Sequence, residues 1–98
     1  MTFGEKIKEL RLSKNITQRE LAAQLDIAPS MYNRFEKNER RIKHELLYKL
    51  SELLDITEEE LNKYWVADQI YKLLECEKNP NDVISLVSEN LNKYHLEE

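Results

Sequence analysis

The chain has 98 residues, of which 15 are basic and 19 acidic, giving a formal net charge of −4. Apolar residues make up 41% of the sequence, which fits one compact domain with a short extension and excludes a disordered chain. The single glycine, Gly4, argues against glycine-rich loops that hold nucleotide phosphates, and the single cysteine, Cys76, excludes an intrachain disulfide. Because there is no signal-peptide core and no run of about 18 apolar residues, we expect a soluble cytoplasmic protein.

Apolar residues recur at helical spacing along most of the chain, so the sequence predicts an all-α fold. The first helix is expected over Phe3–Lys14 and ends at Asn15, a residue type that tolerates the left-handed backbone of a helix stop. Thr17 and Glu20 have the spacing of a capping box, in which each side chain accepts a hydrogen bond from the backbone amide of the other residue. They therefore start a second helix, which runs to about Leu25.

A third helix is expected over residues 29–37, because Pro29 suits a first turn in which no backbone N–H is needed. Tyr32 and Phe35 form its inward stripe, and Asn38 ends it. Burial of these two aromatic rings leaves polar side chains on the opposite face: Ser30, Asn33, Arg34 and Lys37. A fourth amphipathic helix is predicted over residues 43–54.

Two more helices are expected in the last part of the chain. The segment Thr57–Glu60 has the pattern of a second capping box and starts a long helix over residues 58–77. The sequence Asn-Pro-Asn at 79–81 breaks this helix, and a last helix is predicted over 81–94, before residues 95–98 fray. The apolar stripes of both helices must be buried, either against the domain or against a second subunit.

Residues 7–41 resemble the helix-turn-helix domain of phage repressors and Xre-type bacterial regulators. The resemblance depends on matched residues at matched spacing: Ile7, Leu10 and Arg11; Asn15-Ile16-Thr17-Gln18, Glu20, Leu21 and Ala22; Leu25-Asp26-Ile27; Ser30, Tyr32, Asn33, Arg34, Phe35, Glu36 and Asn38; and the helix Leu46–Leu54. It covers about residues 3–61. It implies a lambda repressor-like DNA-binding domain of four to five helices over residues 1–61, with a C-terminal helical extension over 62–98.

The resemblance implies that the third helix is a recognition helix lying in the major groove of double-stranded DNA. It assigns base reading to Pro29, Ser30, Asn33 and Arg34. It assigns contacts with DNA phosphates to residues before and after this helix: Thr17, Gln18, Lys37, Arg40, Arg41 and Lys43. Arg34 can pair with guanine and Asn33 with adenine, and each such pair is worth about 1–3 kcal/mol of base discrimination.

Three further features follow from the same resemblance. Arg11 and Glu36 match a pair that forms an internal salt bridge between the first and third helices of the family. Ala28 departs from the family, which usually places a serine or threonine there to cap the recognition helix. Asn15 and Asn38 stand where the family usually has glycine, and asparagine is the residue type that best replaces it.

The charges are unevenly distributed along the chain. Residues 1–45 contain 10 basic and 7 acidic side chains, whereas residues 46–98 contain 5 basic and 12 acidic ones. Five of the basic residues lie within 34–43, around the end of the predicted recognition helix. The overall acidity is therefore compatible with DNA binding, and it places the DNA-binding surface in the first half of the chain.

The C-terminal extension is expected to form a homodimer, because one recognition helix reads only a few base pairs. A twofold dimer spans half-sites about 34 Å apart, one turn of DNA. The candidate interface residues are the apolar side chains of the last two helices: Trp65, Ile70, Leu74, Val83, Leu86, Val87 and Leu91. Packing of these helices on their own domain is the other possibility.

The sequence therefore predicts a sequence-specific, DNA-binding transcriptional regulator, acting as a repressor or autoregulator on a double-stranded operator. The alternative is a protein–protein interaction module, such as an antitoxin or adaptor, that uses its C-terminal helices to hold a partner. No set of nucleophile, base and orienting group can be assembled, and His44 has no neighbour at metal-ligand spacing. We therefore expect no enzyme activity, no metal, no cofactor and no membrane partner.

Overall fold

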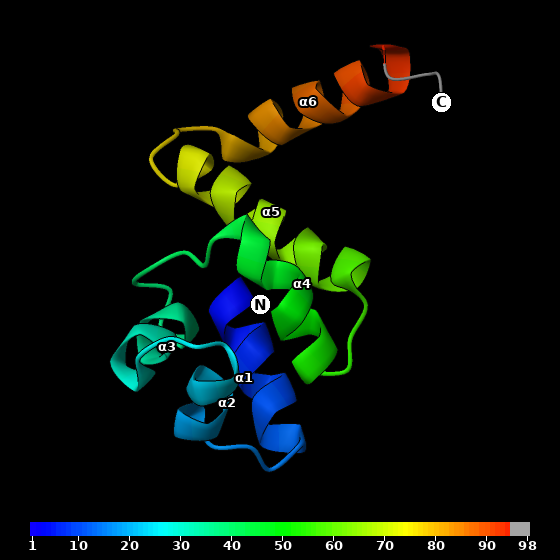
Figure 1. Cartoon of the computed structure of the whole chain (residues 1–98). Coiled ribbons are helices and arrows are strands. Elements are labelled where there is room, and N and C mark those ends of the chain that lie inside the picture. The colour runs from blue at the N-terminus through cyan, green and yellow to red at the C-terminus, as the bar shows by residue number, and fades with distance from the viewer. Residues whose placement is uncertain (95–98) are drawn as a thin grey trace. The chain divides into compact units, whose positions relative to one another are not determined.

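The computed structural model describes residues 1–94, and all regular structure within them is helical (Figure 1). Six helices follow one another along the chain: α1 Phe3–Ser13, α2 Gln18–Gln24, α3 Pro29–Glu36, α4 His44–Leu53, α5 Glu58–Leu74 and α6 Pro80–Tyr94. The chain forms two compact units, Met1–Asp68 and a second that begins at Gln69. The division lies within α5, beyond residue 61, where the sequence places the end of the DNA-binding domain.

The prediction of an all-α fold is confirmed. The fifth helix is shorter than predicted, since it ends at Leu74, where the amide of Glu77 closes a turn on the Leu74 carbonyl at 3.0 Å. Pro80 is the first residue of α6 rather than part of a break, as its missing N–H allows at that position. The expected fraying of residues 95–98 lies outside the described residues.

Side-chain caps fix the starts of the first two helices. The Thr17 hydroxyl accepts from the Glu20 amide at 3.0 Å, and the Glu20 carboxylate accepts from the Thr17 amide at 2.8 Å. The same reciprocal box forms at Thr2 and Glu5 before α1, which the sequence analysis did not predict. The capping box predicted for α5 is only half formed. The Thr57 hydroxyl accepts from the backbone amide of Glu60, but the Glu60 carboxylate pairs with Lys63 at 3.1 Å instead of with the Thr57 amide.

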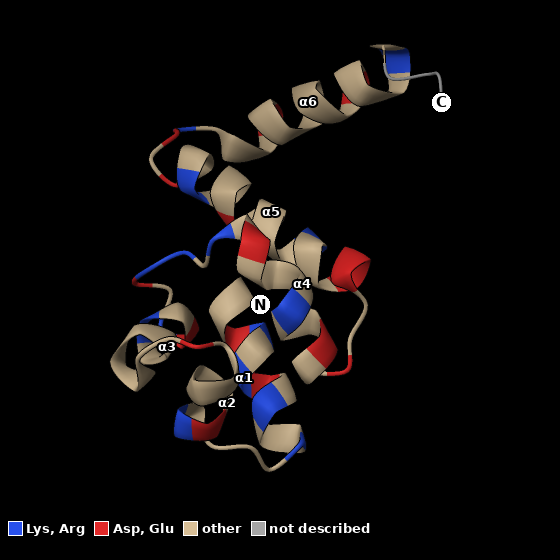
Figure 2. Cartoon of the chain, in the orientation of Figure 1, with Lys and Arg blue, Asp and Glu red and all other residues tan. Residues whose placement is uncertain are grey.

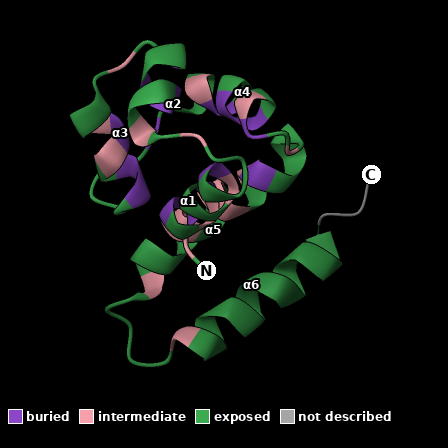
Figure 3. Ribbon diagram, turned by 90° about the horizontal axis from the view of Figure 1, so that it is seen from below, coloured by how far each residue is buried: buried purple, intermediate pink, exposed green. Residues whose placement is uncertain are grey.

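One hydrophobic core holds the first unit together. It contains side chains from every helix of that unit and from the loop before α4: Phe3, Ile7, Leu21, Ala22, Leu25, Tyr32, Phe35, Ile42, Leu47, Leu50, Leu54 and Leu61. The buried residues in Figure 3 lie where α1 to α5 face one another. Leu61 is fully buried, so the first turns of α5 belong to this core.

The helix stops use asparagine and aspartate in the left-handed region. Asn15, Asp26, Asn38 and Asp55 have φ of 57°, 61°, 58° and 58°, and they follow α1, α2, α3 and α4 respectively. These short polar residues tolerate the conformation better than other side chains do. Asparagine can therefore stand in place of glycine at residues 15 and 38 because it tolerates the positive φ that the backbone has there.

The start of α1 is hydrogen-bonded to residues of two distant segments of the chain. The Asn38 side chain, after α3, accepts from the Gly4 amide at 3.1 Å and donates to the Thr2 hydroxyl at 2.6 Å. Asp68, on α5, accepts from the Phe3 amide at 3.0 Å. The amides of Phe3 and Gly4, at the positive end of this helix, are thus satisfied by residues far along the chain.

Gly4 is placed where any side chain would collide with backbone. A Cβ at this position would lie 2.6 Å from the carbonyl oxygen of Phe35 and nearer still to that of Glu36. Real Cβ contacts are longer than this, so α1 would have to move away from the end of α3. The only glycine of the chain is therefore required for close packing between two helices.

The second unit contains an amphipathic helix with an uncovered apolar face. Within Pro80–Tyr94, which the structure describes in full, no residue is buried. The apolar side chains of α6 are between 36% and 70% exposed: Val83, Ile84, Leu86, Val87, Leu91 and Tyr94. Among the helices described, none is both long and apolar enough to cross a membrane.

Gly4→Ala is expected to lower the free energy of unfolding by about 1–3 kcal/mol, as overpacking against rigid neighbours does. Alanine favours a helix over glycine by up to about 1 kcal/mol, so a net loss isolates the collision with the carbonyls of α3. Urea unfolding followed by circular dichroism measures it. Lys8→Ala, at an exposed site of the same helix, is the control. Equal stability of Gly4→Ala and the wild type would contradict the close approach.

Candidate nucleic-acid interface

Helices α2 and α3 are joined by residues 25–28, and α3 packs against both α2 and α1 (Figure 1). Ala28 precedes α3 with extended backbone and makes no side-chain cap, and Pro29 occupies the first turn. The departure from the usual cap is therefore real, and the fixed φ of proline compensates by starting the helix. This short joint sets the angle between the two helices.

The two faces of α3 differ in burial and polarity. Tyr32 and Phe35 are buried, with their rings 6.3 Å apart and nearly perpendicular at 82°. Ser30 and Arg34 are exposed, and Asn33 is half-buried. The side chains predicted to read bases therefore lie away from the core, where a double helix has access to them.

A buried ion pair joins α1 to α3. The Arg11 Nε lies 2.6 Å from one Glu36 carboxylate oxygen, and its Nη2 lies 3.2 Å from the other, in a two-pronged geometry. The Arg11 Nη1 also donates to the carbonyl of Ile16, in the loop before α2, at 2.9 Å. The resemblance implied this pair, and the structure adds the bond to the loop. The hydrogen bond with Glu36 raises the pKa of Arg11.

Hydrogen bonds continue from this pair to the surface. The Gln18 amide nitrogen donates to the Glu36 carboxylate at 2.8 Å, and the Gln18 amide oxygen accepts from the Asn33 side chain at 3.1 Å. Because a carboxylate only accepts, Gln18 must turn its nitrogen toward Glu36 and its oxygen toward Asn33. Asn33 then keeps its own oxygen and one N–H for another partner.

The pKa of the Glu36 carboxyl reflects this environment. Burial by itself raises the pKa, but the hydrogen bonds from Arg11 and Gln18, together with the nearby Tyr32 hydroxyl, hold it below its usual range. Burial raises the pKa of Tyr32 as well. The pair therefore remains charged at neutral pH, and Gln18 keeps a charged acceptor.

Sequence reasoning assigned Gln18 and Asn33 separately to phosphate and base, and it missed the bond between them. The residues lie on different helices, and their side chains meet only because α2 and α3 cross here. Thr17 is exposed and uses its hydroxyl oxygen as a cap, so its hydroxyl hydrogen is still able to donate.

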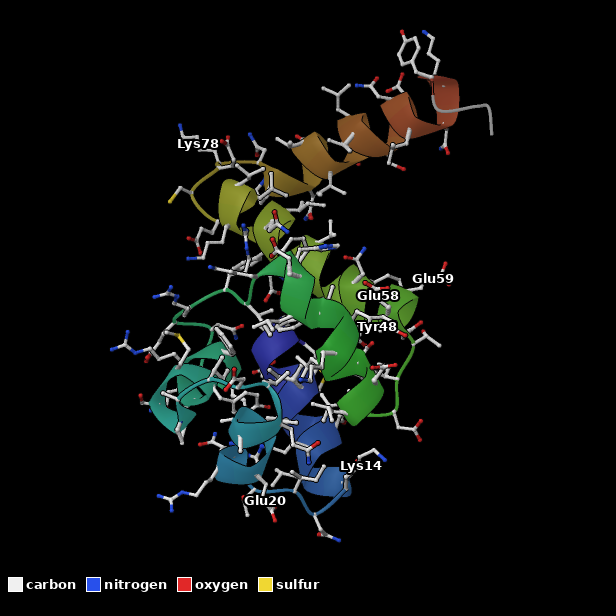
Figure 4. The ribbon with its side chains drawn as sticks, viewed as in Figure 1. Lys14, Glu20, Tyr48, Glu58, Glu59 and Lys78 are labelled. Atoms are coloured by element: carbon white, nitrogen blue, oxygen red, sulfur yellow. The ribbon has the colours of Figure 1, made fainter. Side chains whose placement is uncertain are left out.

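Basic side chains gather beside α3, in the loop that leads to α4. Figure 2 shows this loop at the left of the first unit, with the acidic start of α5 at the right. The predicted phosphate-binding residues of the loop are all exposed: Lys37, Arg40, Arg41 and Lys43. Glu58, at the start of α5, lies near Tyr48 of α4 (Figure 4). Exposed positive charge is therefore concentrated beside α3.

The residues predicted for a dimer interface have different surroundings. Trp65 is half-buried in the first unit, where its indole N–H donates to the Ile42 carbonyl at 2.9 Å. Leu74 is half-buried, and Ile70 is 41% exposed. The four predicted residues of α6 are exposed: Val83, Leu86, Val87 and Leu91. Among residues 1–94, no group of three or more acidic, histidine or cysteine side chains is arranged to hold a metal ion.

In a comparison with known protein families, residues 7–61, more than half of the chain, match the family model described as helix-turn-helix. The chain is also 31% identical over 81 residues to the HTH-type transcriptional activator BcrR of Enterococcus faecalis. That similarity covers 83% of this chain but only 38% of the relative, so the chain spans less than half of that protein's length. No solved structure matches the chain.

Glu36→Gln is expected to cost about 3–5 kcal/mol at pH 7, because it leaves Arg11 buried without a counter-charge. The folded pKa of Glu36 lies below the unfolded one, so its contribution is complete above the ordinary glutamate pKa of about 4.3 and is lost as pH falls through the folded pKa. The stability difference between wild type and variant should therefore shrink below about pH 4.3.

Urea unfolding across a pH series measures this difference, with Glu9→Gln, at an exposed position of α1, as the control. A difference that stays constant down to the acid limit of folding would show that the ionised Glu36 contributes nothing.

Proposed function

Since this chain belongs to the helix-turn-helix family of DNA-binding transcriptional regulators, we propose that it binds a double-stranded operator as a homodimer, with α3 in the major groove. One observation carries the proposal: the outward face of α3 is polar, anchored by a buried ion pair and flanked by an exposed basic loop. The family match and the exposed basic residues beside α3 both support DNA binding at this face. A location in the cytoplasm, with the DNA, is part of the same proposal.

Base reading is proposed for the exposed face of α3. Arg34 has a free guanidinium fork that suits the two acceptors of guanine, and Asn33 offers an acceptor and a donor, as adenine requires. Gln18 holds Asn33 in place, so Asn33 enters the groove with its amide already oriented. Ser30 and Pro29 stand at the start of the helix, where contact with the groove floor is closest.

Phosphate contacts are proposed on both sides of the recognition helix. Thr17 and Gln18 lie at the start of α2, where backbone amides and the helix dipole favour an anion. The other contacts come from the basic loop: Lys37, Arg40, Arg41 and Lys43. Each phosphate neutralised adds about −0.9 to the slope of log affinity against log salt.

The homodimer is proposed to form through the C-terminal helices. The apolar face of these helices is exposed. An amphipathic helix is stabilised by burying such a face, so this exposure supports an interface with a second subunit. Acidic residues predominate in this part of the chain, so it is poorly suited to touching phosphate. Two subunits related by a twofold axis would read half-sites about 34 Å apart.

Repression, including repression of the chain's own gene, is the proposed regulatory outcome. A protein bound over a promoter blocks polymerase without any further contact. The proposed outcome differs from that of the relative BcrR, which is named as an activator. DNase footprinting of the DNA upstream of the chain's own gene tests the outcome. A footprint that overlaps the promoter supports repression, and one that lies upstream of it contradicts repression.

Arg34→Ala and Asn33→Ala should each weaken operator binding by about 1–3 kcal/mol, or roughly 5- to 150-fold. Both residues lie outside the buried core, so the thermal melt should hardly change. Gel shifts with the footprinted fragment measure the affinity, with Lys49→Ala as the control because Lys49 is an exposed cation of α4. Unchanged affinity in both variants would rule out α3 as the reading helix.

Val87→Asp and Leu91→Asp should convert the homodimer to a monomer, because a carboxylate cannot be buried in an apolar interface without a partner. Sedimentation velocity measures the molecular mass in solution. Ser85→Asp, on the polar side of α6, should leave the dimer intact. A wild-type chain that sediments as a monomer would contradict the homodimer and favour the interaction module, with α6 as its docking face.

A further inference from the structure

The basic loop between α3 and α4 is held by a residue of α5. Within the loop, Arg41 and Lys43 are exposed, whereas Ile42 between them is 1% exposed and packs into the core. Trp65 contacts this point. Its indole N–H donates to the Ile42 carbonyl at 2.9 Å, so the backbone of the loop is tied to α5 as well as to the core.

The face of the same indole lies against a cation of the loop. The central guanidinium carbon of Arg41 is 5.1 Å from the centre of the Trp65 ring, within the range of a cation–π contact. The His44 ring, at the start of α4, meets the indole edge-on at 4.8 Å. One side chain of α5 therefore contacts the loop at its backbone, at its arginine and at the helix that follows.

We propose that Trp65 is a positioning residue for the contact between Arg41 and a DNA phosphate. A guanidinium that lies against an aromatic face keeps its N–H donors along its edge, where a phosphate can accept them. The contact also restricts the Arg41 side chain before DNA arrives, so less conformational freedom is lost on binding. This inference depends on the proposed function, since it assumes that the basic loop meets DNA.

The inference extends the DNA-binding machinery beyond the helices that touch DNA. Trp65 is half-buried, and its indole N–H is already used by Ile42. Its contribution would therefore be indirect. A residue that only stabilises the fold would change the melting temperature, whereas a positioning residue also changes how binding depends on salt.

The test measures fluorescence anisotropy of a labelled DNA duplex of arbitrary sequence at a series of NaCl concentrations, with the full chain. Arg41→Gln should lower the steepness of the log–log salt dependence by about 0.9 per subunit, because one phosphate contact is lost. Trp65→Leu should lower it by a similar amount, although it removes no charge. The affinity of each variant should fall roughly three- to tenfold at low salt.

Conservative variants separate positioning from folding. Trp65→Phe keeps an aromatic face and should retain the wild-type salt dependence, with a smaller loss of affinity from the missing N–H bond. Trp65→Met also removes that face but has an unbranched, flexible side chain, and it should behave like Trp65→Leu, so it serves if circular dichroism shows that the leucine variant is unfolded. Tyr48→Leu removes an exposed aromatic residue of α4 and should change nothing.

Two results would overturn the inference by different routes. Salt-dependent binding by the wild type with an unchanged slope in Trp65→Leu and Trp65→Met would disprove the role of Trp65 and leave the proposed function standing. Absence of salt-dependent binding by the wild type would remove both. The double variant Trp65→Leu with Arg41→Gln tests whether the two residues act together. A slope of log affinity against log salt equal to that of Arg41→Gln alone would support the coupling of Trp65 to Arg41, and a further loss of slope would contradict it.

Discussion

The buried ion pair between Arg11 and Glu36 is the interaction on which the rest of the DNA-binding domain depends. Removing two charges from water is costly, and the pair persists only because other partners complete it. Arg11 also bonds the carbonyl of Ile16, and Glu36 also accepts from Gln18. The pair therefore connects α1, the loop after it, α2 and α3, and it fixes the position of α3 relative to the helices that support it.

The same pair has a second consequence at the surface. The Glu36 carboxylate can only accept hydrogen bonds, so the side-chain amide of Gln18 must point its nitrogen toward Glu36. The Gln18 oxygen then accepts from Asn33, which leaves the Asn33 oxygen and one N–H for another partner. Replacing a buried ion pair with apolar residues of similar volume is often neutral or stabilising in proteins. Apolar side chains would not orient the two amides, so the charges of this pair also set the orientation of Gln18 and Asn33.

The sequence predicted the features that depend on near neighbours and missed those that depend on distant ones. The six helices, the capping box at Thr17 and the polar face of α3 all follow from spacing within one segment. The indole of Trp65 donates a hydrogen bond to the Ile42 carbonyl, and Asp68 accepts one from the Phe3 amide, 65 positions away. No local sequence pattern predicts either hydrogen bond. The role of Gly4 was hidden for the same reason: it depends on backbone carbonyls that only the folded chain brings near it.

The left-handed helix stops also affect the chain before it folds. A glycine at each of Asn15, Asp26, Asn38 and Asp55 would adopt the required backbone without strain, but it would give the unfolded chain more conformations to lose. Asparagine and aspartate accept some local strain in the native state and restrict the unfolded ensemble. A domain built with one glycine therefore starts folding from a stiffer denatured state, and part of its stability originates there rather than in any contact of the folded structure.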